Sequence, residues 1–327
     1  MKKYLAKWFM VIIVVAIMIG AGFLTKNLPE GARAASALAE EPSSKEAEHT
    51  FQFLISIPNQ YEGNTRIEEN LIEKTVRIVL PGISEFSFST IVLEKNDSRV
   101  VKTERSYENG NGMLLIYLDD WYVCEGAYEG GKLSLQFTPV HEKYDRILVI
   151  DPGHGGESDT GTIAYGYEEK DLTLALAKEV KTLLTRELKD CYVCLTRLED
   201  TALSEREREN FAQELDADFY LSIHMGADPS SRATTGVSTY YNSADNRLGK
   251  SYAKTLRDCI ADAIEGQDTG VIKEDKQVFT NKFQIPALIV EAGYLTNKQE
   301  ARMLGTSEYR KTLALGIAAG IEKIINQ

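Results

Sequence analysis

The sequence contains few cysteines, few prolines and fewer basic than acidic side chains. Four cysteines in 327 residues are too few and too scattered for a disulfide framework. With 8 prolines and 43% hydrophobic residues, the chain is too apolar to be wholly disordered, and its length suits one or two globular domains. The 37 basic side chains against 49 acidic ones, with no basic cluster after the N-terminus, argue against a nucleic-acid partner.

The N-terminal segment, residues 1–39, differs from the rest of the chain. Three lysines within its first seven residues precede an uncharged apolar run of 17 residues over 8–24, which is at the short limit for crossing a bilayer. The basic flank predicts that the remainder of the chain works outside the cytoplasm. Residues 1–39 are either a cleaved signal peptide or an uncleaved membrane anchor. The small-residue sequence that ends at Ala39 lies 15 residues beyond Leu24, which favours the anchor.

A polar linker over 40–49 leads into a β-rich segment over 50–142. Turn-forming residues separate its short apolar runs, which predicts a small all-β sandwich-like domain. This segment carries no catalytic cluster, so it is either a packing or spacer domain or a module that binds the cell wall or a partner. The runs expected to form strands are 51–57, 75–81, 86–94, 113–119 and 132–138.

The segment over 143–327 alternates apolar strand patterns with helical stripes, which indicates an α/β fold. Its strands are apolar throughout instead of alternating, as a twisted, mostly parallel sheet covered by helices on both faces requires. Cys191 and Cys194 are three positions apart on one expected strand and therefore point to opposite faces. The expected strands are 146–150, 192–196, 218–223, 236–241, 277–279 and 287–290, and the expected helices are 171–188, a helix that opens with the capping box at 204–207, 246–264 and 307–325.

Polar side chains suited to metal chemistry follow three of these strands. His154 lies in a glycine-rich loop after the first strand, His224 directly follows another, and Glu291 follows a third. Because the carboxyl ends of parallel strands form one crevice, these residues are expected to converge there, joined by a carboxylate from the pair Glu168 and Glu169. Two histidines and one carboxylate form a catalytic zinc set with one open position, which leaves Glu291 to act as a base.

Six segments, in order and with compatible spacing, closely resemble the zinc-dependent N-acetylmuramoyl-L-alanine amidases of the Amidase_3 type. They are IDPGHGG at 150–156, EEKDLTLALA at 168–177, LTRLED at 195–200, YLSIHMGA at 220–227, GVSTYY at 236–241 and PALIVEAGYLTNKQE at 286–300. The resemblance implies that His154, Glu169 and His224 bind one zinc ion per chain and that Glu291 is catalytic. Glu169 is chosen over its neighbour because it directly precedes Lys170.

The resemblance also implies the reaction and the substrate. Family chemistry cuts the amide bond between N-acetylmuramic acid and the L-alanine of the stem peptide, so peptidoglycan is the expected partner and the cell wall or the outer face of the cytoplasmic membrane the expected location. The β-rich segment over 50–142 resembles, by its position and pattern, the AMIN-type localisation domains that precede some cell-wall amidases. Two other hypotheses remain: a catalytically idle wall-binding or regulatory protein with this fold, and a zinc hydrolase of a different amide bond.

Three positions depart from the family pattern. Gly226 stands where the family usually has asparagine, Gln213 replaces asparagine in the helix after LTR, and Thr269 precedes Gly270 where arginine is common. None of these changes removes an expected ligand or the expected base. They concern substrate affinity and rate more than the type of reaction.

Overall fold

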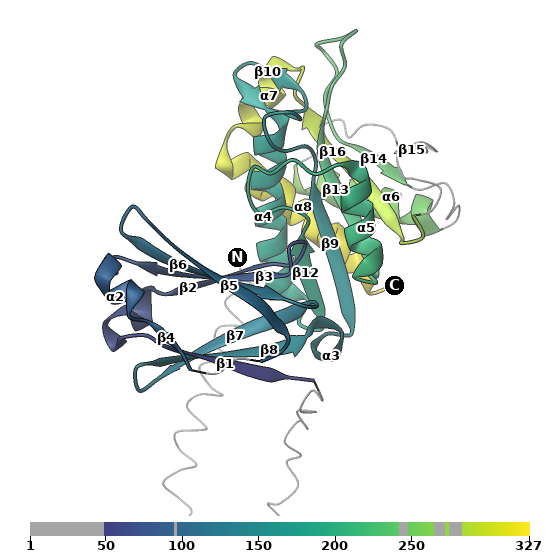
Figure 1. Ribbon diagram of the computed structural model, residues 1–327. Coiled ribbons are helices and arrows are strands. Elements are labelled where there is room, and N and C mark those ends of the chain that lie inside the picture. The colour runs from purple at the N-terminus through teal and green to yellow at the C-terminus, as the bar shows by residue number, and fades with distance from the viewer. Residues whose placement is uncertain (1–48, 95–96, 242–247, 265–271, 275–282) are drawn as a thin grey trace, which may run out of the picture. The chain divides into compact units, whose positions relative to one another are not determined.

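The computed structural model describes residues 49–94, 97–241, 248–264, 272–274 and 283–327 (Figure 1). Residues 47–327 belong to one compact unit. Among the described helices, none combines the length and the apolar character needed to span a bilayer. The expected signal peptide or anchor over 1–39 lies outside the described residues, as does the expected strand at 277–279.

Two four-stranded antiparallel sheets form the β-rich part of the chain (Figure 1). The strands of the first, in spatial order, are β4 (Val92–Leu93), β1 (Phe51–Ser56), β8 (Lys132–Pro139) and β7 (Tyr122–Glu129). Those of the second are β2 (Arg66–Asn70), β3 (Thr75–Pro81), β6 (Asn111–Leu118) and β5 (Val100–Glu108). Short helices lie between or after the strands: the 3₁₀-helix η2 (Asn59–Asn64), α2 (Glu85–Ser89) and α3 (Val140–Lys143).

The two sheets share one apolar core. Every second residue of β6 is buried, as expected for a strand with one face toward a core. Phe53 and Leu135 from the first sheet and Ile78 and Ile116 from the second belong to the same buried cluster. The expected all-β sandwich is therefore confirmed.

The prediction of a strand over 86–94 was wrong. Residues 85–89 form helix α2, and only Val92 and Leu93 pair as a strand. The side chain of Ser84 accepts a hydrogen bond from the backbone N–H of Ser87 at 3.1 Å, which caps the first turn of the helix. This local cap outweighs the β-propensity of the phenylalanines that follow it.

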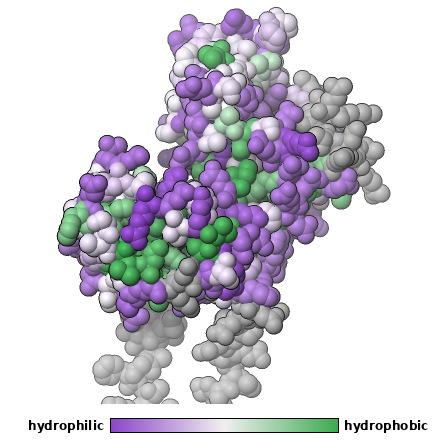
Figure 2. Space-filling view, viewed as in Figure 1, coloured by the Kyte–Doolittle hydropathy of each residue, from purple (hydrophilic) through white to green (hydrophobic). Residues whose placement is uncertain are grey.

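Apolar side chains lie exposed on the β-rich part. Figure 2 shows green, hydrophobic patches among the hydrophilic surface of this part of the molecule. Phe86 is 78% exposed, and Val92 and Val101 are more than half exposed. A wall-binding or partner-binding role for this segment stays a prediction, because these side chains do not identify a ligand.

The second half of the chain is built on a six-stranded sheet. In spatial order its strands are β12 (Cys191–Leu195), β9 (Arg146–Pro152), β13 (Phe219–Gly226), β16 (Ala287–Tyr294), β14 (Ser238–Tyr241) and β15 (Ile272–Glu274). All neighbours run parallel except β14 and β16, which are antiparallel. A small hairpin of β10 (Ile163–Ala164) and β11 (Tyr167–Glu168) lies between β9 and the first long helix.

Helices cover both faces of this sheet, which confirms the expected α/β fold. On β9, Leu148 and Ile150 pack into a cluster with residues of α4, α6 and α8, whereas Ile147 and Val149 pack into another with residues of α5. Cys191 and Cys194 fall into these two clusters respectively and thus face opposite sides, as expected. The helices are α4 (Glu169–Glu187), α5 (Glu205–Glu214), α6 (Leu248–Ala263), α7 (Lys298–Leu304) and α8 (Ser307–Ile325).

Two boundaries differ from the prediction in ways that matter for the site. Strand β13 continues through His224 to Gly226, so this histidine lies within the strand and not after it. Helix α4 begins at Glu169, two residues before the expected start. Both side chains therefore project from regular elements, which fixes their backbone more firmly than a loop does.

Candidate active site

His154 lies in a tight loop directly after β9. Its backbone is in the left-handed region, with φ of 63°, which is uncommon for a residue other than glycine. Arg208 on α5 donates a hydrogen bond from Nη2 to the carbonyl oxygen of His154 at 2.8 Å. This conformation stores strain that the surrounding contacts must hold, a pattern that is concentrated at functional sites.

Two buried arginines fix the carbonyl groups of this loop. Arg208 donates from Nη1 to Pro152 O at 2.9 Å, and Arg197 donates from Nε to the same oxygen at 3.0 Å. Arg197 also donates from Nη2 to Gly153 O at 3.0 Å. Burial and the nearby Arg208 charge lower the pKa of Arg197 to about 10. Both arginines thus serve the fold of this loop.

The charge of Arg208 is balanced by Asp151, the aspartate of the IDPGHGG segment. The two side chains meet at 2.6 Å and are 6% and 3% exposed. Asp151 also accepts hydrogen bonds from Thr196 at 2.5 Å and from Ser222 at 2.8 Å. Burial alone would raise the pKa of this carboxyl group, but the Arg208 charge and these hydrogen bonds hold it below its ordinary value.

Asp151→Asn is expected to lower the free energy of unfolding by about 3 kcal/mol at pH 7, because it leaves the Arg208 cation buried without its partner. The lowered pKa of Asp151 means that the pair stabilises the fold above the ordinary aspartate range, and this contribution is lost as the pH falls through the pKa of the folded state. Urea denaturation at pH 7 and at a pH well below the ordinary pKa of aspartate should therefore show a smaller pH dependence for the variant. The control Glu187→Gln breaks an exposed pair with Arg186 and should change stability by less than about 1 kcal/mol. Equal effects of the two substitutions would contradict this prediction.

Glu169 is the first residue of α4 and is only 3% exposed. Its Oε2 accepts a hydrogen bond from the backbone N–H of Thr162, and its Oε1 accepts one from Met225, both at 2.9 Å. Burial would raise the pKa of this carboxyl group, but hydrogen bonds from His154 and His224 and their charge hold it well below its ordinary value. Glu169 is therefore a carboxylate with a fixed orientation.

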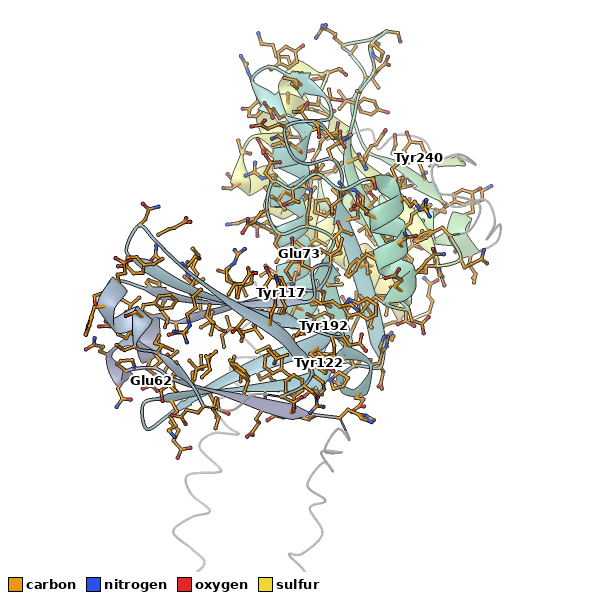
Figure 3. All side chains as sticks on the ribbon, in the orientation of Figure 1. Glu62, Glu73, Tyr117, Tyr122, Tyr192 and Tyr240 are labelled. Carbon is orange, nitrogen blue, oxygen red and sulfur yellow. The ribbon has the colours of Figure 1, made fainter. Side chains whose placement is uncertain are left out.

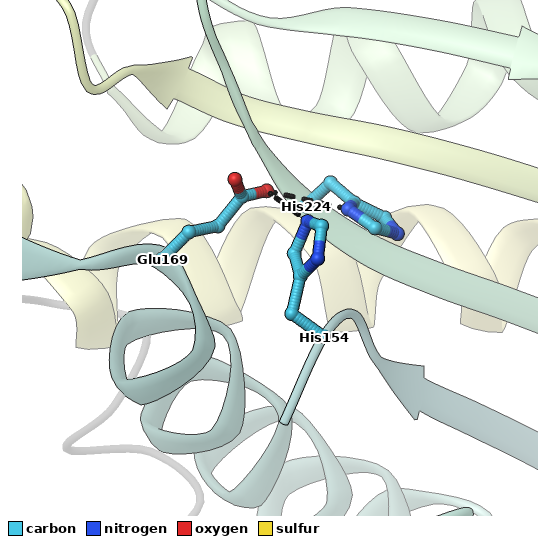
Figure 4. A group of neighbouring side chains, drawn as sticks. All are labelled: His154, Glu169 and His224. Carbon is cyan, nitrogen blue, oxygen red and sulfur yellow. Dashed lines mark hydrogen bonds and ion pairs between the residues drawn. The ribbon is translucent and has the colours of Figure 1, made fainter. Parts of the chain in front are cut away.

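The side chains of His154, Glu169 and His224 converge on one point (Figure 4). Glu169 Oε1 lies 3.3 Å from His154 Nε2 and 3.2 Å from His224 Nδ1. One ligand atom from each residue lies within 4.8 Å of the others. Two imidazole nitrogens and one carboxylate oxygen at this spacing fit the donor set of a catalytic zinc site.

The second ring nitrogen of His154 is held by Asp159, a residue that the sequence analysis did not single out. Nδ1 of His154 lies 2.6 Å from Asp159 Oδ1. Burial lowers the pKa of His154, but Glu169 and Asp159 outweigh it and raise this pKa above the ordinary value. A carboxylate that binds one ring nitrogen directs the other toward a metal. The signal available in the sequence was an aspartate five residues after His154.

Gly153 allows the two histidines to approach each other. A Cβ atom at this position would lie 2.3 Å from Cε1 of His224, well inside van der Waals contact. Gly161, with φ of +64°, is packed in the same way against His154 and Glu169, where a Cβ would lie 2.6 Å and 2.8 Å from their nearest atoms. These glycines are required by the close packing of the three side chains and not only by the turns that contain them.

Gly153→Ala is expected to lower zinc affinity by about 10- to 100-fold, the range found when the surroundings of metal ligands are disturbed. The new methyl group displaces the His224 ring, while the backbone of Gly153 does not require a positive φ. Competition with a chromogenic chelator measures the affinity. The control Gly63→Ala adds a methyl group where no atom lies within 4 Å. If both variants bind zinc with the affinity of the wild-type protein, the His224 ring tolerates the methyl group at position 153 and the prediction is wrong.

Glu291 lies on β16 beside His224, with which it is paired in the parallel register. Its Oε2 accepts a hydrogen bond from the hydroxyl group of Tyr240 at 2.9 Å. His154, Glu169, His224 and Glu291 all line one cleft of about 730 Å³. Another cleft of about 700 Å³ is lined by none of these four residues. The first cleft is thus the one in which the expected ligands and the expected base face the same space.

Comparison with known proteins shows the family to which the chain belongs. The family model described as N-acetylmuramoyl-L-alanine amidase matches residues 148–323, more than half of the chain. The chain belongs to this amidase family. The sporulation-specific N-acetylmuramoyl-L-alanine amidase of Bacillus subtilis (strain 168) is 34% identical over 179 residues, which cover 55% of this chain and 68% of that protein. The expected amidase family and hydrolase activity are confirmed.

Two solved structures of the amidase family resemble the same half of the chain. The catalytic domain of CwlV from Bacillus (Paenibacillus) polymyxa var. colistinus is 31% identical with a TM-score of 0.51, covering 55% of this chain and 98% of that one. The amidase AmiC2 of Nostoc punctiforme is 28% identical with a TM-score of 0.52, covering 56% and 98%. The amidase fold therefore accounts for the second half of the chain.

The structure describes the surroundings of two of the three positions that depart from the family pattern. A Cβ atom at Gly226 would lie 3.0 Å from the ring of Tyr294, so the aromatic ring occupies the space next to this glycine. Gln213 lies on α5 and is not among the residues that line the cleft. Thr269 lies outside the described residues.

Proposed function

We propose that this chain is a zinc-dependent peptidoglycan hydrolase that cleaves the amide bond between N-acetylmuramic acid and the L-alanine of the stem peptide. The observation that carries the proposal is the convergence of His154, Glu169 and His224 in the cleft that Glu291 also lines. Membership of the amidase family supports the choice of substrate.

The three converging residues would hold the zinc ion, one per chain. Asp159 keeps His154 oriented with Nε2 toward the site, and backbone N–H groups hold both oxygens of Glu169. The chemistry that zinc supplies when bound is Lewis-acid polarisation of a carbonyl group and activation of water. Two neutral imidazoles and one carboxylate would leave a bound divalent ion with net positive charge.

Glu291 would act as the general base. It projects from the buried strand β16, next to His224 in register, so its carboxylate faces the cleft from a rigid support. In this role it takes a proton from the attacking water and later delivers it to the departing amine of L-alanine. The glycan strand and the stem peptide are thereby separated.

The N-terminal sequence supports a location outside the cytoplasm. The lysines and the apolar run over 8–24 have the pattern of a signal peptide or membrane anchor, and the proposed substrate is a component of the cell wall. Both alternatives for residues 1–39 support a location in the wall or at the outer face of the membrane.

Digestion of purified muropeptides tests the proposal. A chain of residues 47–327, which form one compact unit, is incubated with substrate with and without a chelator, and products are identified by mass spectrometry. The expected result is a stem peptide with a free N-terminal L-alanine, formed only without chelator. Absence of any product would indicate an idle protein with this fold. Products without a new N-terminal L-alanine would indicate a hydrolase of another amide bond.

A further inference from the structure

The antiparallel strand β14 brings a tyrosine to the proposed base. Ser238 of β14 pairs with Glu291 of β16, and Tyr240 pairs with Ile289. Because side chains alternate along strands, Ser238, Tyr240, Ile289 and Glu291 share one face of the sheet. His224, which pairs with Glu291 from the other side, shares this face as well. Figure 3 labels Tyr240 on this strand, and its side chain lines the cleft with the proposed ligands.

The contact between Tyr240 and Glu291 is a hydrogen bond to one oxygen of the carboxylate. The phenol donates to Oε2 at 2.9 Å. Burial, followed by the charge of Glu291 and this hydrogen bond, raises the pKa of Tyr240, so the phenol keeps its proton. A donor that binds one carboxylate oxygen restrains rotation of the whole group.

The hydroxyl group of Tyr240 is in turn held by other hydroxyl groups. The side chain of Ser238 hydrogen-bonds to Tyr240, and Ser238 Oγ lies 3.2 Å from the hydroxyl oxygen of Tyr294. Ser238 is 1% exposed, and Tyr294 packs against Gly226. A series of hydroxyl groups thus ends at the carboxylate of Glu291, and each member limits the movement of the next.

We propose that Tyr240 is a positioning residue that holds the Glu291 carboxylate in the orientation that proton transfer requires. The inference rests on the proposed function, in which Glu291 is the base. The inference adds Tyr240 to the proposed active site as a residue that acts through Glu291 and does not contact the metal. Loss of the phenol oxygen should therefore slow turnover without changing zinc content or substrate affinity.

The test is a double-mutant cycle on the chain of residues 47–327 with soluble muropeptide as substrate. Tyr240→Phe is expected to lower kcat by about 10- to 100-fold, the range for a hydrogen bond to a charged group, with KM and zinc content unchanged. In the Glu291→Gln background, Tyr240→Phe should change the residual rate by less than about twofold, because the carboxylate on which the phenol acts is already gone. Tyr241→Phe is the matched control, since Tyr241 is the next residue of β14, faces the apolar core and should leave kcat unchanged.

The possible results separate the two proposals. An unchanged kcat in Tyr240→Phe, a loss of zinc from it, or an equal effect of the substitution with and without the Glu291 carboxylate would overturn the positioning role. An equal effect in both backgrounds would indicate that the phenol contacts the substrate instead. Full activity of Glu291→Gln would overturn the role of Glu291 in the proposed function, on which this inference rests.

Discussion

Glu291→Gln is expected to retain one zinc ion per chain while its turnover of muropeptide falls by about 10²- to 10⁴-fold, the usual contribution of a positioned acid–base group. The amide keeps the shape of the side chain and can still accept a hydrogen bond from Tyr240. It cannot accept a proton from water at neutral pH. Steady-state kinetics together with metal analysis of the same sample measure both quantities.

Glu169→Gln is the matched comparison, because it makes the same chemical change at the carboxylate that lies among the ligand atoms. A neutral amide is a poor ligand for a cation, so zinc affinity itself should fall. The substitution also weakens the buried interactions with His154 and His224. If Glu291→Gln loses zinc while Glu169→Gln keeps both zinc and activity, the roles assigned to the two carboxylates are reversed.

His154→Ala and His224→Ala are each expected to lose both zinc and activity. Three protein ligands leave no redundancy, so removal of one leaves two and an incomplete site. The unchanged chain should contain about one zinc ion, and metal analysis after dialysis measures the content of each variant. The matched control is His141→Ala, because His141 is exposed on α3 and lines neither cleft.

The outcome that would contradict the proposed metal site is full zinc occupancy in both histidine variants. Zinc loss from His141→Ala would also contradict it, since this residue has no place among the converging ligand atoms. Thermal unfolding of each variant shows whether an effect on zinc arises from the site or from loss of the fold.

The strands and helices that carry the site could largely be predicted from the sequence. The apolar run at 146–150 has no polar alternation, so it predicts a strand covered on both faces, and β9 is such a strand. The rule that parallel strands end at one edge then placed His154, His224 and Glu291 in one crevice, and all three line the same cleft. Local patterns and one topological rule were sufficient for these positions.

The supporting residues could not be predicted in the same way. Tyr240 reaches Glu291 across 51 positions of sequence, and only the antiparallel register of β14 against β16 brings the two together. Asp159 binds His154 because the backbone of Gly155 pairs with that of Asp159, a loop geometry that no periodic pattern reveals. At residues 85–89, the side chain of Ser84 caps a helix, and the strand prediction was therefore wrong there. Each of these cases depends on a particular contact and not on the pattern of apolar residues.

The three proposed ligands come from segments that lie far apart in the sequence, with Glu169 and His224 55 positions apart. A bound ion would therefore act as a cross-link that only the folded chain can form, and its binding free energy would add to folding stability. At a free zinc concentration about 1,000 times the dissociation constant, this linkage amounts to about 4 kcal/mol. The melting temperature should then rise with the zinc concentration, which makes thermal denaturation a measure of metal affinity that needs no substrate.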